Sequence, residues 1–166
     1  MTVLSVTIIQ LCQDAGIYGH LFKSDFIPRS LPTPQGLKFD FIFAFSVFTH
    51  LSEKVTHISL DTLADHLAED GVLAITIRPK EYWEFATTHL KAFNKSEMKD
   101  LLDHHEREGF AFAPHRGEKI EGDVTYGDTS MTLEYLSSAS SKLRVSALEW
   151  SATDPYQLIV LMTRAA

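Results

Sequence analysis

The hydrophobic pattern of the chain is most continuous in residues 39–45, FDFIFAF, where only Asp40 is polar. An apolar run of this length without alternation is typical of a strand buried on both faces, as in the centre of a parallel sheet. The run leads directly into Ser46, Thr49 and His50. The pattern therefore predicts a central strand that is followed by a polar, functional loop.

A helix and a second strand are predicted directly after this loop. Ser52 is a favourable N-cap, and apolar residues then recur at helical spacing. These residues are Leu60, Leu63, Ala64 and Leu67. Gly71 is expected to end the helix, so that residues 72–77, VLAITI, form a short buried strand. A strand, a helix and a strand of these lengths predict a parallel βαβ unit.

The residues before this unit allow more than one interpretation. Apolar residues within 8–12 predict a helix that ends near Gly16, whereas the β-branched residues within 2–7 also allow a strand. We expect a short strand at residues 19–22. Residues 28–38 contain three prolines and are expected to form a surface loop.

The second half of the chain changes from alternating elements to a strand-rich end. Helices are predicted after Pro79 and at residues 96–108, the latter ending at Gly109. Strands are then predicted at residues 110–114, 132–136, 143–150 and 157–163. We therefore expect one α/β domain over residues 1–166, whose mostly parallel sheet carries antiparallel C-terminal edge strands.

Composition and charge narrow the possible functions. The 166 residues include 22 acidic and 15 basic side chains, for a net charge of −7, which disfavours nucleic acid and anionic membranes as partners. The single cysteine, Cys12, excludes an internal disulfide and a cysteine metal cluster. No apolar run reaches the length of a membrane span, and the N-terminal residues lack the features of a signal peptide. We expect a soluble, cytoplasmic protein.

Three segments together resemble the second half of the class I S-adenosylmethionine-dependent methyltransferases. They are KFDFIFAFSVFTHLSEKV at 38–55, LADHLAEDGVLAITIRP at 63–79 and DPYQLIVLMTR at 154–164. In that family, a strand of the Phe-Asp-apolar type leads into a Ser/Val/His-Leu turn, and the next helix leads into a strand that closes on an Arg-Pro-like corner. The resemblance covers most of residues 8–163 and implies a doubly wound, Rossmann-like sheet.

The resemblance also implies where S-adenosylmethionine would bind. In doubly wound sheets, ligands lie beyond the carboxyl ends of the strands. Asp25 and Phe26 match the family's acid and apolar neighbour that bind adenine, and Phe45 and Ser46 would face the methionine part of the cofactor. Asp25 could equally serve only to begin the turn before Pro28.

An acceptor site is implied beside the cofactor. His50 would orient or deprotonate a small-molecule or lipid-like acceptor, whereas the simpler interpretation is a histidine bonded to backbone at a helix entrance. Arg78, Tyr82 and Trp83 would line the substrate pocket, although Trp83 could be a core residue and Arg78 a surface residue.

The chain departs from the family in its glycines. None of the eight glycines forms the Gly-x-Gly step of the family's cofactor loop, and little sequence precedes Asp25. We therefore expect a truncated family member with an incomplete cofactor site. Its function is either methyl transfer or, alternatively, that of a catalytically silent interaction module or a chain that needs a partner. An uncovered edge strand at residues 19–22 would then favour a two-fold homodimer.

A metal site is not expected. His57, Asp61 and Asp65 lie four residues apart on one predicted helical face, but no fourth ligand or catalytic glutamate accompanies them. A polar helix face is the better interpretation.

Overall fold

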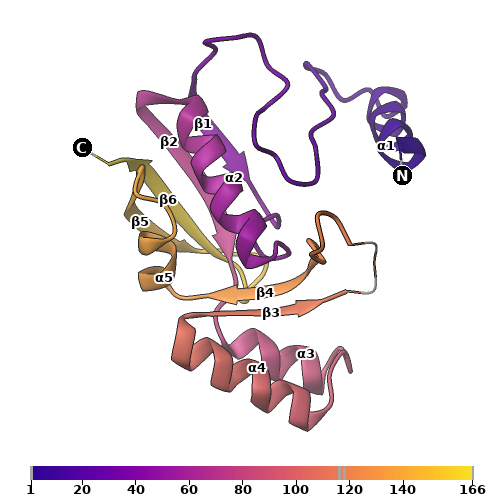
Figure 1. Cartoon of the computed structure of the whole chain (residues 1–166), viewed down its shortest axis with the longest axis vertical. Helices are drawn as coiled ribbons and strands as arrows, with labels where there is room; N and C mark the ends of the chain where they lie inside the picture. Colours follow the sequence, from indigo (N-terminus) through magenta and orange to yellow (C-terminus); the bar gives the residue numbers. More distant parts are fainter. Residues whose placement is uncertain (1, 116, 118, 166) are drawn as a thin grey trace.

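The computed structural model of the chain describes residues 2–115, 117 and 119–165. A four-stranded sheet has the order β1-β2-β6-β5, and a separate two-stranded hairpin pairs β3 with β4 (Figure 1). The strands are β1 (Phe39–Ala44), β2 (Leu67–Ile77), β3 (Phe110–Pro114), β4 (Gly127–Met131), β5 (Leu143–Trp150) and β6 (Leu158–Arg164). β1 and β2 are parallel, whereas β2 with β6, β5 with β6 and β3 with β4 are antiparallel.

Helices cover the sheet and the hairpin separately. They are α1 (Thr2–Asp14), α2 (Glu53–His66), α3 (Glu81–Thr88), α4 (Lys95–Glu108) and α5 (Leu133–Ser138). In Figure 1, α2 lies against the sheet beside β1 and β2, while α3 and α4 lie along the hairpin. In the same view, α1 stands apart and is joined to β1 by the long loop of residues 15–38.

The main core lies between α2 and β2. Leu60 and Ala64 of α2 pack in one buried cluster with Leu73, Ile75 and Ile77 of β2. Because α2 connects two adjacent parallel strands, its apolar face necessarily returns to the sheet that it joins. The predicted βαβ unit is therefore confirmed.

Local signals also fix the boundaries of α4. Asn94 and Glu97 form a capping box, in which each side chain accepts a hydrogen bond from the other residue's backbone N–H. At the other end, Gly109 has a left-handed φ of 72°, which glycine adopts without steric cost. The helices predicted after Pro79 and at residues 96–108 are confirmed.

The sheet differs from the prediction at β1, which is an edge strand and not a central one. Ile42 and Ala44 pack on the core, but Phe41 and Phe43 on the opposite face are 60% and 57% exposed. The apolar run indicated two covered faces, whereas the described chain covers one. The prediction of a mostly parallel sheet was also wrong, because one of its three strand pairs is parallel.

The N-terminal predictions are corrected in two places. α1 occupies the residues for which a strand had remained possible, and residues 19–22 form no strand.

Two boundaries in the rest of the chain also differ. α2 ends at His66, and Gly71 lies inside β2, where a Cβ atom would come within 2.8 Å of the Phe39 carbonyl oxygen. The close approach of β1 explains this glycine better than helix termination does. The strand predicted at residues 132–136 is instead α5, because Thr132 caps that helix by accepting from the Tyr135 N–H.

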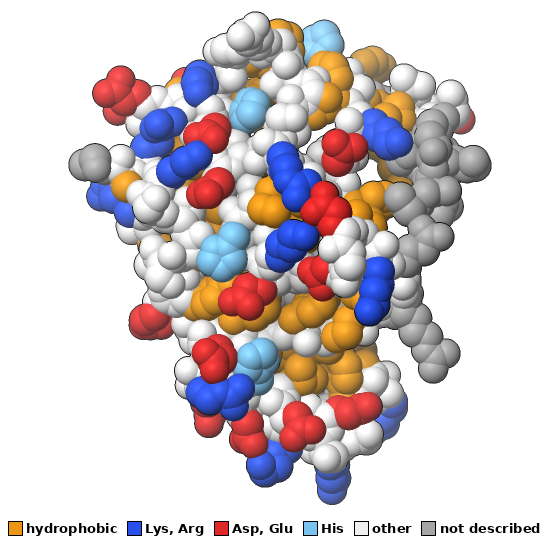
Figure 2. All heavy atoms as spheres, in the orientation of Figure 1, with side chains coloured by type: hydrophobic (Ala, Val, Ile, Leu, Met, Phe, Trp, Pro, Cys, Tyr) orange, Lys and Arg blue, Asp and Glu red, His pale blue; other side chains and the backbone are white. Residues whose placement is uncertain are grey.

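Charged side chains of both signs are interspersed on the face shown in Figure 2, with hydrophobic patches between them. Within the described ranges, no helix is long and apolar enough to cross a membrane.

Candidate functional site

Three segments meet where β1 and β2 end. Arg78 directly follows β2, and Thr49 and His50 lie in the loop after β1. β4 joins both: the Thr129 N–H donates to the Thr49 carbonyl at 2.9 Å, and the Met131 N–H donates to the Arg78 carbonyl at 3.0 Å. The hairpin therefore brings its own side chains to the sheet edge at which α/β proteins bind ligands.

The Asp128 carboxylate is the centre of the site. It accepts hydrogen bonds from Arg78 Nη1 at 2.5 Å, Tyr82 Oη at 2.9 Å and His115 Nε2 at 2.9 Å, and the residue is 7% exposed. Burial by itself would raise the pKa of Asp128, but the bonds from His115 and Tyr82 and the charge of Arg78 hold this pKa below its ordinary value. Asp128 is therefore a stable, buried anion.

Arg78 is held in one orientation by three contacts. Its Nη1 also donates to the Thr49 carbonyl at 3.0 Å, and its guanidinium carbon lies 4.0 Å from the centroid of the Tyr82 ring. Arg78 thus connects the loop after β1 with α3 and with Asp128. We refer to Thr49, His50, Arg78, Tyr82, His115, Tyr126 and Asp128 as the Asp128 cluster.

His50 lies at the edge of this cluster with one ring nitrogen anchored. Its Nδ1 is 2.7 Å from the Gly127 carbonyl oxygen, which can only accept, so Nδ1 carries the proton of the neutral ring. The Nε2 lone pair then accepts a long hydrogen bond, 3.4 Å, from Nη2 of Arg78. Burial lowers the pKa of His50, and the positive charge of Arg78 lowers it further, against the opposing effects of Gly127 and Asp128. His50 is thus a neutral base at neutral pH.

Tyr126 and His115 form the solvent side of the cluster. Tyr126 is 54% exposed and stacks on His50, with ring centroids 5.1 Å apart and planes inclined by 15°. The His115 ring meets Tyr126 edge-on at 5.3 Å. The site therefore opens to solvent through an aromatic surface directly beside the His50 base.

The structure brings together three of the four residues that were predicted to form the methyl-acceptor site. His50, Arg78 and Tyr82 meet in the Asp128 cluster. Trp83 is fully buried, and its Nε1 donates to Ser130 Oγ at 2.7 Å, as the core interpretation of this residue implied. Sequence reasoning missed Asp128, His115 and Tyr126. The one sequence feature that pointed to this part of the site is the carboxylate of Asp128, which lies in a short segment of small polar residues.

The predicted cofactor residues lie outside the cluster. Asp25 and Phe26 are exposed in the loop before β1, and Phe45 is exposed just past the end of β1. Ser46 adopts a left-handed φ of 57°, and its N–H already donates to Thr76 Oγ1 at 2.8 Å.

The described glycines before β1 do not resemble the family's close-fitting cofactor loop. Gly16, Gly19 and Gly36 lie in open loops, where an added Cβ would meet no atom within 4 Å, so they form no close-fitting cradle. The Ser46 amide is likewise engaged within the protein.

The helical face that was considered for a metal has structural partners instead. His57 Nδ1 donates to the Ala139 carbonyl at 2.7 Å, Asp61 accepts from Ser140 at 2.6 Å, and Asp65 pairs with Lys142 at 2.7 Å. Across the described part of the chain, no group of three or more His, Cys, Asp or Glu side chains is arranged to hold a metal ion.

Comparison with solved structures identifies the fold as that of the class I S-adenosylmethionine-dependent methyltransferases, over most of this chain. A methyltransferase of this kind from Clostridium acetobutylicum ATCC 824 aligns with a TM-score of 0.54 at 10% identity, over 95% of this chain and 69% of that chain. No protein-family model and no curated protein matches the sequence.

Two O-methyltransferases show the same likeness. NcsB1, from neocarzinostatin biosynthesis and solved with S-adenosylmethionine and 2-hydroxy-5-methyl naphthoic acid, aligns with a TM-score of 0.56 at 13% identity, over 97% of this chain. Mitomycin 7-O-methyltransferase MmcR aligns with a TM-score of 0.56 at 14% identity, over 94% of this chain. This chain spans 38% of the length of each.

Proposed function

We propose that this chain forms the acceptor side of an S-adenosylmethionine-dependent methyltransferase that acts on a small hydroxylated molecule. The observation that carries the proposal is the neutral His50 base at the ligand-binding edge of a methyltransferase fold, with Nδ1 anchored and with Nε2 held only by a long hydrogen bond from Arg78. The cofactor would supply the methyl group.

His50 would act as the general base for the acceptor. The acceptor hydroxyl would displace the long Arg78 bond and give its proton to Nε2, while the Gly127 carbonyl keeps the ring in place through Nδ1. The Asp128 oxygen that lies 3.6 Å from Nδ1 stabilises the positive charge that the ring then carries. Proton transfer to a positioned base typically contributes about 10²–10⁴-fold to a rate.

Arg78 and Tyr126 would position the reacting groups. Arg78 fixes the loop that carries His50 through the Thr49 carbonyl. Tyr126 offers an exposed ring parallel to that of His50, on which an aromatic acceptor can stack. NcsB1 has also been solved with 1,4-dihydroxy-2-naphthoic acid, so a hydroxylated aromatic compound is the acceptor class that we propose.

The cofactor would lie beyond β1, near Phe45 and Ser46, with Asp25 and Phe26 available from the preceding loop. Because the described residues hold only part of such a site, we propose that further residues, from a partner chain or from additional sequence, complete it. Methyl transfer by this chain by itself should accordingly need a high cofactor concentration.

A radiometric assay tests the proposal. The chain is incubated with millimolar methyl-labelled S-adenosylmethionine and 1,4-dihydroxy-2-naphthoic acid. We expect labelled product to form, His50→Gln to lower the rate about 100-fold or more, and His104→Gln, the same change at an exposed position of α4, to leave it unchanged. Equal rates for wild type and His50→Gln would contradict the role of His50.

A second candidate function, an interaction module, is favoured by the free edge of β1. Phe41, Phe43 and Phe45 form an exposed row with successive ring centroids 6.3 and 6.0 Å apart. An edge strand with such a face is suited to pairing with another chain, most simply a second copy in a two-fold dimer.

Sedimentation of the chain tests this candidate. If β1 mediates the dimer, Phe43→Lys should yield a monomer, whereas Phe26→Lys, at a similarly exposed phenylalanine in the preceding loop, should not. A wild-type chain that stays monomeric at high concentration would exclude the β1 dimer.

A further inference from the structure

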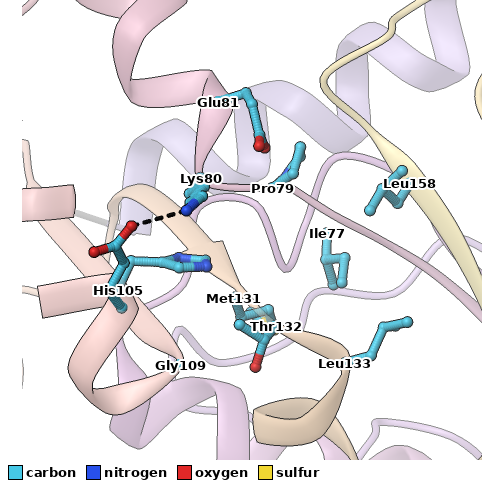
Figure 3. A pocket seen from close by; sticks show the side chains of 11 residues that line it. Ile77, Pro79, Lys80, Glu81, His105, Gly109, Met131, Thr132, Leu133 and Leu158 are labelled. Atoms are coloured by element: carbon cyan, nitrogen blue, oxygen red, sulfur yellow. Dashed lines mark hydrogen bonds and ion pairs between the residues drawn. The ribbon is translucent and has the colours of Figure 1, made fainter. Parts of the chain in front are cut away.

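A cavity of about 630 Å³ lies at the C-terminal end of β4, where Met131 forms part of its lining. It is bounded by the start of α3, the end of α4 and the junction of β4 with α5 (Figure 3). It shares no residue with the Asp128 cluster: β4 contributes Asp128 to the cluster from its beginning and Met131 to the cavity from its end. The cavity is therefore a separate site, independent of the proposed methyl transfer.

The walls of the cavity are mainly apolar. Ile77, Met131, Leu133 and Leu158 contribute hydrophobic side chains from β2, β4, α5 and β6. The volume lies within the range of about 300–1,000 Å³ that small-molecule sites occupy. Size and lining together suit a molecule that buries an apolar ring system.

One polar side chain, His105, is fixed inside this apolar lining. The residue is 4% exposed, and its Nδ1 lies 2.7 Å from Ser130 Oγ. The same oxygen accepts the Trp83 Nε1–H at 2.7 Å, and His105 Nδ1 is the one acceptor recorded for its hydroxyl proton among the described residues, so we assign that proton to the bond with Nδ1. The proton of the neutral imidazole is then on Nε2.

The Nε2–H of His105 is the group available to a ligand. Figure 3 shows the ring projecting from α4 into the space between Lys80 and Met131. Burial lowers the pKa of His105, and the charge of Lys80 adds to this effect, so the ring is neutral at neutral pH. In the described ranges, no protein group forms a hydrogen bond with Nε2, which leaves a donor directed into a mainly apolar cavity.

Charge at the rim selects against anions. Lys80 pairs with Glu106 at 2.8 Å, which neutralises the one basic side chain of the lining. Glu81 adds a further negative charge at the start of α3. The rim therefore has a net charge of −1 and favours an uncharged ligand over a carboxylate or phosphate.

We propose that this cavity binds an uncharged, mainly aromatic small molecule whose single acceptor oxygen takes the hydrogen bond from His105 Nε2. A ketone carbonyl on a two-ring aromatic system has the required chemistry. Such a molecule would place its rings against Met131 and Leu158 and its oxygen toward α4.

Three matched probes test the proposal by titration of the ¹⁵N-labelled chain, followed in ¹⁵N–¹H correlation spectra. 2-Acetylnaphthalene carries a neutral acceptor, 2-ethylnaphthalene has none, and 2-naphthoate is an anion. We expect saturable shifts at the amides of Lys80, Gly109 and Thr132. A hydrogen bond worth about 0.5–1.5 kcal/mol should make the ketone bind about 2–12-fold more tightly than the hydrocarbon. The anion should bind most weakly.

Variants identify the group responsible. His105→Phe should abolish the preference for the ketone over the hydrocarbon. Because this change also removes the bond to Ser130, Leu133→Trp provides a second test: it fills the cavity from α5, leaves the His105 bonds intact and should abolish binding of all three probes. Leu148→Trp, the same change on an exposed position of β5, should not affect binding.

Four results would overturn the proposal. They are the absence of saturable shifts with every probe, equal affinities of the wild-type chain for ketone and hydrocarbon, tightest binding of the anion, and undiminished binding to Leu133→Trp.

Discussion

Removal of the Asp128 carboxylate is the perturbation with the largest expected effect on stability. In Asp128→Ala, the Arg78 guanidinium keeps its Thr49 contact and its place over Tyr82 but loses its counter-charge. Tyr82 and His115 each lose a hydrogen-bond acceptor. The buried cation is then uncompensated, which is more costly than the loss of the ion pair's attraction.

The magnitude follows from the burial of the site. Breaking a buried ion pair by removing one partner costs about 3–5 kcal/mol of the free energy of unfolding. For a chain of this size, about 1 kcal/mol corresponds to about 2–4 °C, so the melting temperature should fall by about 6–20 °C. Asp128→Asn keeps the shape and an acceptor oxygen, and it should fall between Asp128→Ala and wild type.

The assay is urea and thermal unfolding followed by circular dichroism. Asp103→Ala is the matched control, because Asp103 forms an exposed ion pair with Lys99 within α4. Such an exposed pair contributes little to stability, because solvent screens it. If the stabilities of Asp128→Ala and Asp103→Ala lie within about 0.5 kcal/mol of each other, Asp128 does not organise the site.

Three further measurements examine separate parts of the structure. The pKa values of His50 and His105 are lowered from 6.5 in the folded chain, so unfolding takes up protons below about pH 6.5. The stability that both residues contribute should therefore be present above about pH 6.5 and be lost as the pH falls, which urea midpoints between pH 7.5 and 5 would measure. A flat profile would argue against burial of the neutral rings. Phe43→Ala should cost less than about 1 kcal/mol, well below the ~3–5 kcal/mol of a buried phenylalanine, and a larger loss in a thermal melt would indicate that the free face of β1 is covered. Calorimetric titration with S-adenosylhomocysteine should give a dissociation constant of about 1 mM or weaker, since each missing charge-assisted hydrogen bond removes about 1.5–3 kcal/mol; a low micromolar value would mean that the described residues complete the cofactor site.

Sequence reasoning succeeded where each element was determined by its own residues. The βαβ unit follows from two apolar runs and an intervening helical repeat, and α4 follows from its apolar stripe and terminal glycine. His50, Arg78 and Tyr82 could be placed at one sheet edge because they follow the carboxyl ends of two parallel strands. The approximate position of the site was therefore predictable.

β4 could not be found from hydrophobicity. Its residues, GDTSM, are all buried, yet most are polar, because distant groups satisfy them. Thr129 Oγ1 donates to the Leu51 carbonyl at 2.6 Å, and Ser130 bonds with Trp83 and His105. No local pattern encodes partners that lie tens of residues away, so Asp128 was missed together with the strand.

The position of β1 in the sheet was also beyond local reasoning. Its composition suits a strand with neighbours on both sides, and the structure supplies one neighbour, β2. The apolar pattern of a segment indicates that it is suited to a buried strand. Whether Phe41 and Phe43 are in fact covered depends on the other elements that pack against β1.

The proposed methyl transfer depends most on the protonation state of His50. Long-range ¹⁵N–¹H correlation spectra of the chain labelled in its histidines distinguish the two neutral tautomers and the cation, with His50→Gln used to assign the signal. At pH 7 we predict a neutral ring that is protonated on Nδ1, has a deprotonated Nε2 and titrates below pH 6.5. A ring that is protonated on Nε2, or that is charged at pH 7, would contradict the proposal that His50 is the base of the acceptor site.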